Sequence, residues 1–264
     1  MIEKNQNIVL NFLPLVEQDF SFTVFRRLVK HQEKKWSDRI RKYNLPRNQG
    51  VNENFTSYWV SFNQFENSET FTITAKTNIY LTQWYIHFLL IQRISEQQVI
   101  KQYNHKSDFN KFRTYFEREC YKEGVRTIWL EPYYLKKNHK FGFLIGFRFF
   151  LNENQSYNKK VQQLAFSLDS DGRSNKNFHI DIYKYFKQFI EKFFNNTINP
   201  IGNNISISSS FEPLESGLLA TKIYEFSKEK TSNSQFNGIM SYGPFQQVNN
   251  NFKYVFLFRE SEKP

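Results

Sequence analysis

The chain has 264 residues and a mass of 32.0 kDa, enough to bury a sizeable core in one large or two small domains. Its formal net charge of +11 favours a polyanionic partner, nucleic acid before an acidic membrane surface. No run of about 18 apolar residues is present and the first ten residues do not resemble a signal peptide, so we expect no membrane contact. The single cysteine, Cys120, excludes an internal disulfide and is typical of the cytoplasm, where we expect the protein to reside.

The amino-terminal part of the chain predicts strands and two helices. Four segments are rich in residues that favour strands or alternate in polarity, and we predict them as strands: 7–16, 20–28, 55–62 and 70–77. Residues 26–43 have the spacing of a helix, because Val29, Trp36 and Ile40 fall on one stripe. A second helix is predicted over 78–94, and its lack of a clean apolar stripe indicates burial on most sides.

The middle of the chain predicts helices on both sides of a strand meander. A helix is predicted over 107–124, with Ser107 as its N-cap and Gly124 as its C-cap. The meander then has strands over 126–137, 140–152 and 159–169. Residues 178–194 predict an amphipathic helix, and short extended segments follow at 205–211 and 219–226. Because strands and helices do not alternate strictly, the pattern indicates an α+β fold with mixed or antiparallel sheets.

The predicted helix 26–43 carries the strongest charge signal in the sequence. Between Arg26 and Lys42 stand eight basic and two acidic residues. An apolar stripe on the core would turn the basic side chains outward together, where they neutralise phosphates and release counterions. The candidate contacts on this basic helix are Arg26, Arg27, Lys30, Lys34, Lys35 and Arg39. The alternative is a solvated helix face, with Glu33 and Asp38 pairing locally.

A second basic group lies at a predicted hairpin tip. Lys136, Lys137 and Lys140 surround the turn, and Arg148 lies on the strand that follows. Tyr133 and Tyr134 precede the turn, and basic residues interleaved with aromatic ones suit a surface that follows a nucleic-acid backbone and stacks bases. The alternative is an ordinary polar hairpin loop.

Acidic residues give only a weak signal for catalysis. Asp169 and Asp171 lie just before Gly172, as in a calcium loop, but the position of the final calcium-loop ligand holds Ile180 instead of Glu. A metal-dependent nuclease would need these two residues and Glu131 to converge. The five histidines show no ligand spacing, and no nucleophile or phosphate-loop motif is present. We therefore predict no catalytic residue, no metal and no cofactor.

Two stretches of the sequence resemble a known family. Near the end, "NGIMSYGPF" (237–245) places a stiff Tyr-Gly-Pro turn before an aromatic segment, and 161–190 combines a predicted strand and turn with the aromatic helix. Both are similar to the amino-terminal half of prokaryotic Argonaute proteins, in which such a turn closes the second linker. The opening "IVLNFLPL" (8–15) also resembles the first strand of that family's N domain. In this resemblance, Tyr242, Gly243 and Pro244 form a rigid interdomain joint.

The resemblance implies a domain order. It places an N-like α+β domain at 1–95, a linker-1-like meander with a helix at 96–200, a linker-2-like extended segment at 201–245, and the start of a following MID-like domain at 246–264. Too few residues separate the aromatic helix from the turn for an ordinary PAZ domain. An arrangement of these regions without PAZ is called an APAZ domain, the partner of short Argonautes in prokaryotic defence.

The function implied by the resemblance is a non-catalytic half of a guide-directed defence protein. Such a half grips the backbone of a guide–target duplex, of DNA or RNA, and holds a MID-PIWI region in cis or as a separate subunit. The slicing carboxylates of the family would lie in a PIWI domain outside this sequence. Two other hypotheses stay open from the residues alone: a free-standing metal-dependent nuclease, and a protein-interaction scaffold with a basic surface.

The last segment of the chain predicts a strand without a sheet. "FKYVFLFRE" (252–260) has apolar residues on both faces, which is typical of a strand covered on both sides. Since nothing after it in this sequence supplies that cover, we expect residues 246–264 to pack poorly alone and to promote self-association.

Overall fold

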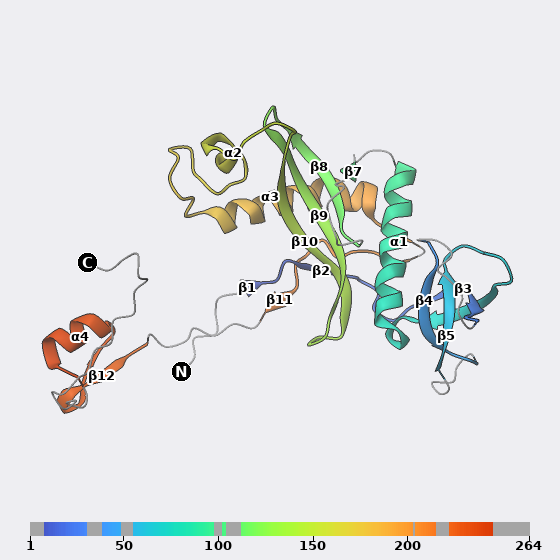
Figure 1. The fold of residues 1–264 in the computed structure, drawn as a ribbon, viewed down its shortest axis with the longest axis horizontal. Coiled ribbons are helices and arrows are strands. Elements are labelled where there is room, and N and C mark those ends of the chain that lie inside the picture. The colour runs from blue at the N-terminus through green and yellow to red at the C-terminus, as the bar shows by residue number, and fades with distance from the viewer. Residues whose placement is uncertain are drawn as a thin grey trace, which may run out of the picture. The chain divides into compact units, whose positions relative to one another are not determined.

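The structure is a computed structural model that describes residues 8–30, 39–48, 55–97, 102–103, 112–202, 204–214 and 222–244. The chain divides into two units, one spanning Ile8–Leu214 and a second that includes residues 222–244. Both contain antiparallel strands and helices, so the predicted α+β class is confirmed (Figure 1). The segment 246–264 lies outside the described residues, and its predicted strand stays a prediction.

A four-stranded antiparallel sheet forms the first layer of the larger unit, in the order β4-β5-β3-β6. Its strands are β3 (Ser21–Leu28), β4 (Arg41–Pro46), β5 (Phe55–Ser61) and β6 (Glu69–Thr74). On β3, Phe22, Val24 and Arg26 are buried while Ser21 and Thr23 are exposed, as period-2 alternation requires. The strands predicted over 20–28, 55–62 and 70–77 are therefore confirmed, the last ending at Thr74.

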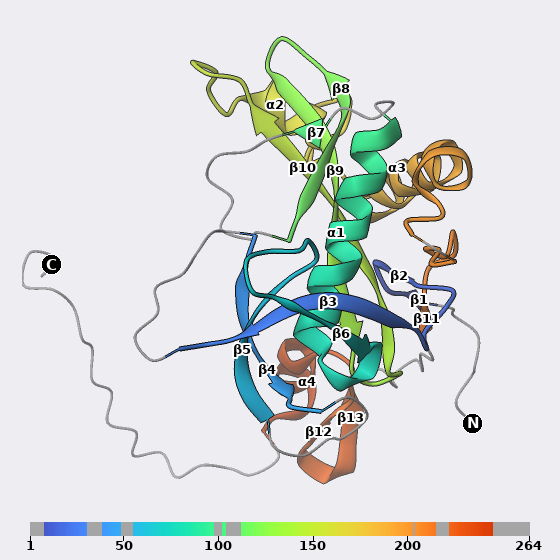
Figure 2. The same cartoon turned by 90° about the vertical axis from the view of Figure 1, so that its right-hand side faces the viewer.

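Helix α1 (Ile79–Gln97) follows a short 3₁₀ turn, η1 (Ala75–Thr77), and contributes side chains to two hydrophobic cores. Leu81 and Trp84 pack into the core of the four-stranded sheet, whereas Ile86 and Leu90 pack into the larger core behind the next sheet. Figure 2 shows strand β3 of the first sheet crossing this helix. Burial from two directions explains why the sequence of this helix has no single apolar stripe.

A five-stranded antiparallel sheet forms the second layer, in the order β2-β10-β9-β8-β7. Its strands are β2 (Phe12–Pro14), β7 (Gln102–Tyr103), β8 (Thr114–Cys120), β9 (Gly124–Leu135) and β10 (Lys140–Leu151). Strands β9 and β10 pair along their whole lengths around a turn at residues 136–139. The two long strands and the basic hairpin tip predicted from the sequence are confirmed.

One face of the second sheet is covered by α1 and by α3 (Phe178–Phe193). The buried side of α3 includes Phe186, Phe189 and Ile190, so the predicted amphipathic face is confirmed. A π-helical turn, η2 (Phe194–Ile198), continues this helix. The short strands β1 (Ile8–Val9) and β11 (Pro213–Leu214) pair with each other, which holds the two ends of the larger unit together.

The smaller described unit is a hairpin with a helix. It contains β12 (Tyr224–Phe226), the turn η3 (Ser227–Glu229), β13 (Lys230–Ser232) and α4 (Gln235–Tyr242). Gly238 lies against the ring of Phe226, where any larger side chain would clash. The helix ends at Gly243, whose φ of 73° favours glycine, and whose amide donates to the carbonyl of Ile239. Gly243 ends the helix, in line with the predicted Tyr-Gly-Pro turn, but α4 itself was not predicted, since this part of the chain was expected to be extended. The role of the turn as an interdomain joint stays a prediction.

The predicted basic helix 26–43 is wrong at both ends. Residues 26–28 continue β3 and pair with 58–60 of β5, and β5 also pairs with β4 from residue 41 onward. Hydrogen bonding to a common neighbouring strand therefore overrides the local helical spacing. The intervening residues 31–38, which include Lys34 and Lys35, lie outside the described residues.

Two predictions in the middle of the chain are also wrong. Residues 114–120 of the predicted helix 107–124 form β8, with Phe116 fully buried against the core, and Gly124 begins β9 instead of capping a helix. The predicted strand 159–169 begins with helix α2 (Lys159–Leu164). Its N-cap Asn158 accepts a hydrogen bond from the amide of Val161 at 3.0 Å, a local signal that the strand interpretation overlooked.

Candidate nucleic-acid interface

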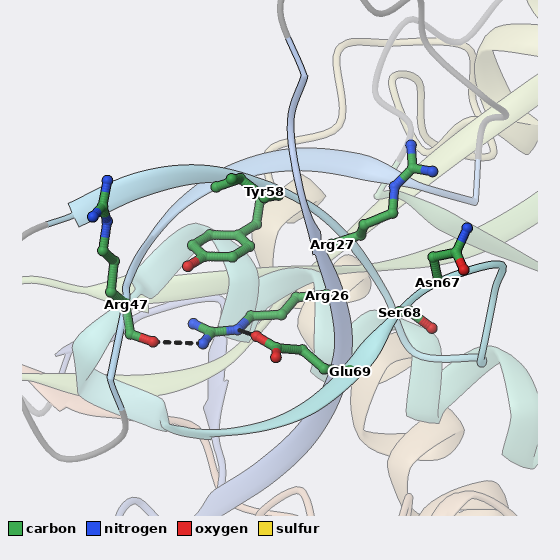
Figure 3. Close-up of a pocket in the computed structure, with 8 residues that line it drawn as sticks. Arg26, Arg27, Arg47, Tyr58, Asn67, Ser68 and Glu69 are labelled. Carbon is green, nitrogen blue, oxygen red and sulfur yellow. Dashed lines mark hydrogen bonds and ion pairs between the residues drawn. The ribbon is translucent and has the colours of Figure 1, made fainter.

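A depression of about 720 Å³ opens on the four-stranded sheet, and its lining includes three arginines. Strands β3 and β5, the residue that follows β4, and the turn and first residue of β6 contribute the walls (Figure 3). The lining residues are Arg26, Arg27, Leu28, Arg47, Tyr58, Asn67, Ser68 and Glu69. Three arginines and one glutamate are thus among the lining residues, so the formal charge of the lining is positive.

Arg26 forms the floor of this basic depression. Its Nε donates to Oε1 of Glu69 at 2.8 Å, its Nη1 to the carbonyl of Pro46 at 2.5 Å and its Nη2 to the carbonyl of Arg47 at 2.7 Å. The guanidinium also lies 3.5 Å from the ring centroid of Phe71 and 4.3 Å from that of Tyr58. Only 5% of this side chain is exposed. The expectation that Arg26 faces outward to bind phosphate is therefore wrong, and its contacts are structural.

The sides of the basic depression carry two further arginines. Arg47 is exposed, and its Nε donates to Oγ1 of Thr56 at 3.0 Å. Arg27 is half-buried, and Figure 3 shows its guanidinium on the opposite side of the depression from Arg47. Arg47 was missed by sequence reasoning because it follows Pro46, beyond the predicted helix. Its only sequence signal is a basic residue at the end of an extended segment.

The remaining predicted residues near this sheet are placed only in part. Lys30 and Arg39 are both exposed, next to the segment 31–38 that the structure does not describe. Lys34 and Lys35 fall within that segment. The structure thus leaves Arg27, Lys30 and Arg39 as predicted contacts and adds Arg47 to them.

The hairpin tip on the second sheet is less available than the sequence predicted. Lys136 and Lys137 are exposed in the turn. Lys140, however, places its Nζ 2.7 Å and 2.9 Å from the two carboxylate oxygens of Glu212, whose side chain is buried. Burial raises the pKa of Glu212, but the hydrogen bonds from Lys140 and Asn138 outweigh it and hold that pKa below its usual range. Lys140 is therefore engaged by a carboxylate of the chain itself, and its predicted contact with nucleic acid stays a prediction.

Arg148 keeps an exposed position on β10, but it has contacts of its own. Its Nη1 lies 3.3 Å from the hydroxyl oxygen of Tyr115, and its guanidinium is 4.7 Å from the ring centroid of Phe150. The hairpin tip and the basic depression lie on different sheets. The structure therefore does not place the two predicted basic groups on the same sheet.

The acidic residues of the nuclease hypothesis do not converge. Glu131 accepts hydrogen bonds from Nε and Nη2 of Arg113 at 3.0 Å and 2.7 Å. Asp169 accepts from the amides of Asp171 and Arg173 within its own turn. Across the described ranges, no three His, Cys, Asp or Glu side chains lie close enough together to hold a metal ion.

Comparison with known proteins gives no family assignment: no family model matches the chain, and no curated protein is significantly similar to it. The helices in the described part of the chain are all too short or too polar to cross a membrane. The functional argument therefore depends on the residues and their geometry.

Proposed function

We propose that the chain is a non-catalytic nucleic-acid-binding scaffold that holds the sugar–phosphate backbone at the basic depression of the four-stranded sheet. The observation that carries the proposal is the arrangement of arginines around this depression, with a buried one beneath it and two others at its sides. Arg47 and Arg27 flank the depression, and the buried Arg26 ties the backbone carbonyl of Arg47 to the sheet. A fixed backbone reduces the conformational entropy that a phosphate contact costs, and guanidinium groups bind phosphate oxygens in a fork.

We further propose, on the sequence resemblance, that this scaffold is the amino-terminal half of an Argonaute-like defence protein. Its ligand would then be a guide–target duplex, and its partner a MID-PIWI region in cis or as a separate subunit. The turn at Gly243 supports this proposal, since a helix that ends in a stiff Gly-Pro step suits a joint between a linker and a following domain.

Fluorescence anisotropy with labelled DNA, RNA and hybrid duplexes at several salt concentrations tests the binding proposal. The double variant Arg27→Gln with Arg47→Gln should weaken binding about tenfold and reduce the salt slope by about two. The matched control is Arg173→Gln with Lys176→Gln, which removes the same charge from exposed residues in another turn. Equal affinities and slopes for both double variants would reject the depression as the binding site.

A further inference from the structure

Glu69 gives the basic depression a hydrogen-bond acceptor that a phosphate cannot use. It is the first residue of β6 and the acidic residue among those that line the depression. Its Oε1 accepts the hydrogen bond from Nε of Arg26 at 2.8 Å, which Figure 3 shows, whereas its Oε2 accepts no hydrogen bond from the described residues. The Glu69 side chain is 62% exposed, so pairing with Arg26 does not remove it from solvent.

Other polar groups of the depression already have partners. The carbonyl oxygens of Pro46 and Arg47 accept hydrogen bonds from Nη1 and Nη2 of Arg26, at 2.5 Å and 2.7 Å. The hydroxyl of Ser68 donates to a backbone carbonyl of its own turn and accepts from a backbone amide there. The second carboxylate oxygen of Glu69 is therefore an acceptor that a ligand in the depression has to satisfy with a donor of its own.

The position of this acceptor is fixed relative to Arg47. One guanidinium, that of Arg26, binds both the Glu69 carboxylate and the backbone carbonyl of Arg47, so these two acceptors lie within the width of that group. A sugar–phosphate backbone of RNA presents an anion and a donor at similarly close range. The ribose 2′-hydroxyl is carried by the carbon next to the one that bears the 3′ phosphate, and this hydroxyl is what distinguishes RNA from DNA.

We propose that Glu69 selects a ribose 2′-hydroxyl, so that the strand held at the basic depression is RNA. This inference rests on the proposed function, because it names the sugar of the backbone bound at that site. A carboxylate repels phosphate but accepts a strong hydrogen bond from a hydroxyl. A strand without the 2′-hydroxyl leaves the carboxylate beside phosphates with no donor to compensate, and therefore binds less tightly.

The test is a fluorescence anisotropy titration of the full chain with two duplexes of identical sequence. One is RNA, and the other carries fluorine in place of each 2′-hydroxyl, which removes the donor but preserves the A-form helix. The unaltered protein should bind the RNA duplex about tenfold more tightly. Glu69→Gln keeps an oxygen for Arg26 but replaces the second carboxylate oxygen with an amide nitrogen, so this ratio should fall close to one.

The matched control is Glu66→Gln. Glu66 is exposed in the turn before β6 and does not line the depression, so this variant removes the same charge nearby and should keep the tenfold ratio. Equal affinity of the unaltered protein for the two duplexes would overturn the proposal, and so would an unchanged ratio in Glu69→Gln. If Glu69→Gln does not fold, Glu69→Asp decides, because it keeps the charge but withdraws the carboxylate; an unchanged ratio there overturns the proposal as well.

A second sequence distinguishes the ribose hydroxyl from the amino groups of the bases. Each ribose of RNA carries the hydroxyl, whereas the amino groups vary with sequence, so the ratio should be the same for two unrelated duplexes. A ratio that changes with sequence would assign the donor to a base and overturn the proposal.

The failure of this inference is distinguishable from that of the proposed function. If the depression binds no nucleic acid, the Arg27→Gln and Arg47→Gln double variant binds both duplexes as its Arg173 and Lys176 control does, and both proposals are rejected. If the double variant weakens binding but the RNA and fluorinated duplexes bind equally to the unaltered protein, only the role of Glu69 is rejected.

Discussion

Both sheets of the larger unit hold an arginine on an aromatic ring beside a carboxylate, but in the four-stranded sheet two further arginines line a depression. In the four-stranded sheet, the buried Arg26 lies beneath a depression whose sides carry Arg27 and Arg47. In the five-stranded sheet, Arg113 lies on the ring of Trp129 and pairs with Glu131. The comparison shows that a strongly basic sequence does not reveal which charges are available to a ligand. Availability depends on whether the fold supplies each guanidinium with an anion of its own.

The largest expected effect is on the free energy of unfolding, and it distinguishes the buried Arg26 of the first sheet from the neighbouring Arg47. Arg26→Met should lower the free energy of unfolding by about 3 kcal/mol, because three hydrogen bonds are lost and two of them satisfy backbone carbonyls. Arg47→Met should change it by less than about 0.5 kcal/mol, since that side chain is exposed. Urea denaturation of both variants measures the difference. Similar losses for the two would mean that Arg26 does not support the depression.

His87 lies between the two sheets and gives a test based on the pH dependence of stability. It lies on α1, 3.1 Å from Oγ1 of Thr114 on the second sheet, and Arg41 of the first sheet is close enough to repel its charged form. Burial, and then Arg41, lowers its pKa from 6.5 to about 4. Between these values the unfolded chain binds more protons than the folded one. Stability should therefore fall as the pH drops from 6.5 to 4, by roughly 2 to 3 kcal/mol.

Denaturation midpoints across that pH range measure the contribution of His87. His87→Gln should flatten the pH dependence between pH 6.5 and 4. His179→Gln, at an exposed position on α3, should leave it unchanged. An unaltered slope in His87→Gln would show that this histidine is not held neutral between the sheets.

A smaller effect is expected at the hairpin tip of the second sheet. Lys140→Ala leaves the buried Glu212 with only the hydrogen bond from Asn138, and should cost about 1.5 kcal/mol at neutral pH. In the unaltered protein the lowered pKa of Glu212 stabilises the fold above the usual value of 4.5, and this stabilisation is lost as the pH falls through the folded pKa. Without Lys140, burial should raise that pKa, so the variant should gain stability on mild acidification.

The exposed Lys137 of the same turn provides the comparison for this variant. Lys137→Ala should keep the stability and the pH dependence of the unaltered protein. Equal behaviour of the two lysine variants would contradict the structural role that the geometry gives to Lys140.

The parts of the fold that were predictable from sequence are those set by local periodicity. Strand β3, the β9–β10 hairpin and α3 each bury one regular face, and that pattern is present in the residues themselves. The start of β4 was missed because its pairing with β5 is a non-local interaction. Contacts between distant segments also escaped prediction: Arg26 finds Glu69 forty-three residues away, and Arg118 meets the rings of α3 only after both elements pack.

Hydrogen–deuterium exchange with and without a bound duplex tests the central claim most directly. If the basic depression holds the nucleic-acid backbone, binding should slow exchange at the ends of β3 and β4, around residues 26–28 and 45–47, and leave the β9–β10 hairpin unchanged. The Arg27→Gln and Arg47→Gln double variant should lose this protection. Protection confined to the β9–β10 hairpin, with the β3 and β4 ends unaffected, would contradict the account.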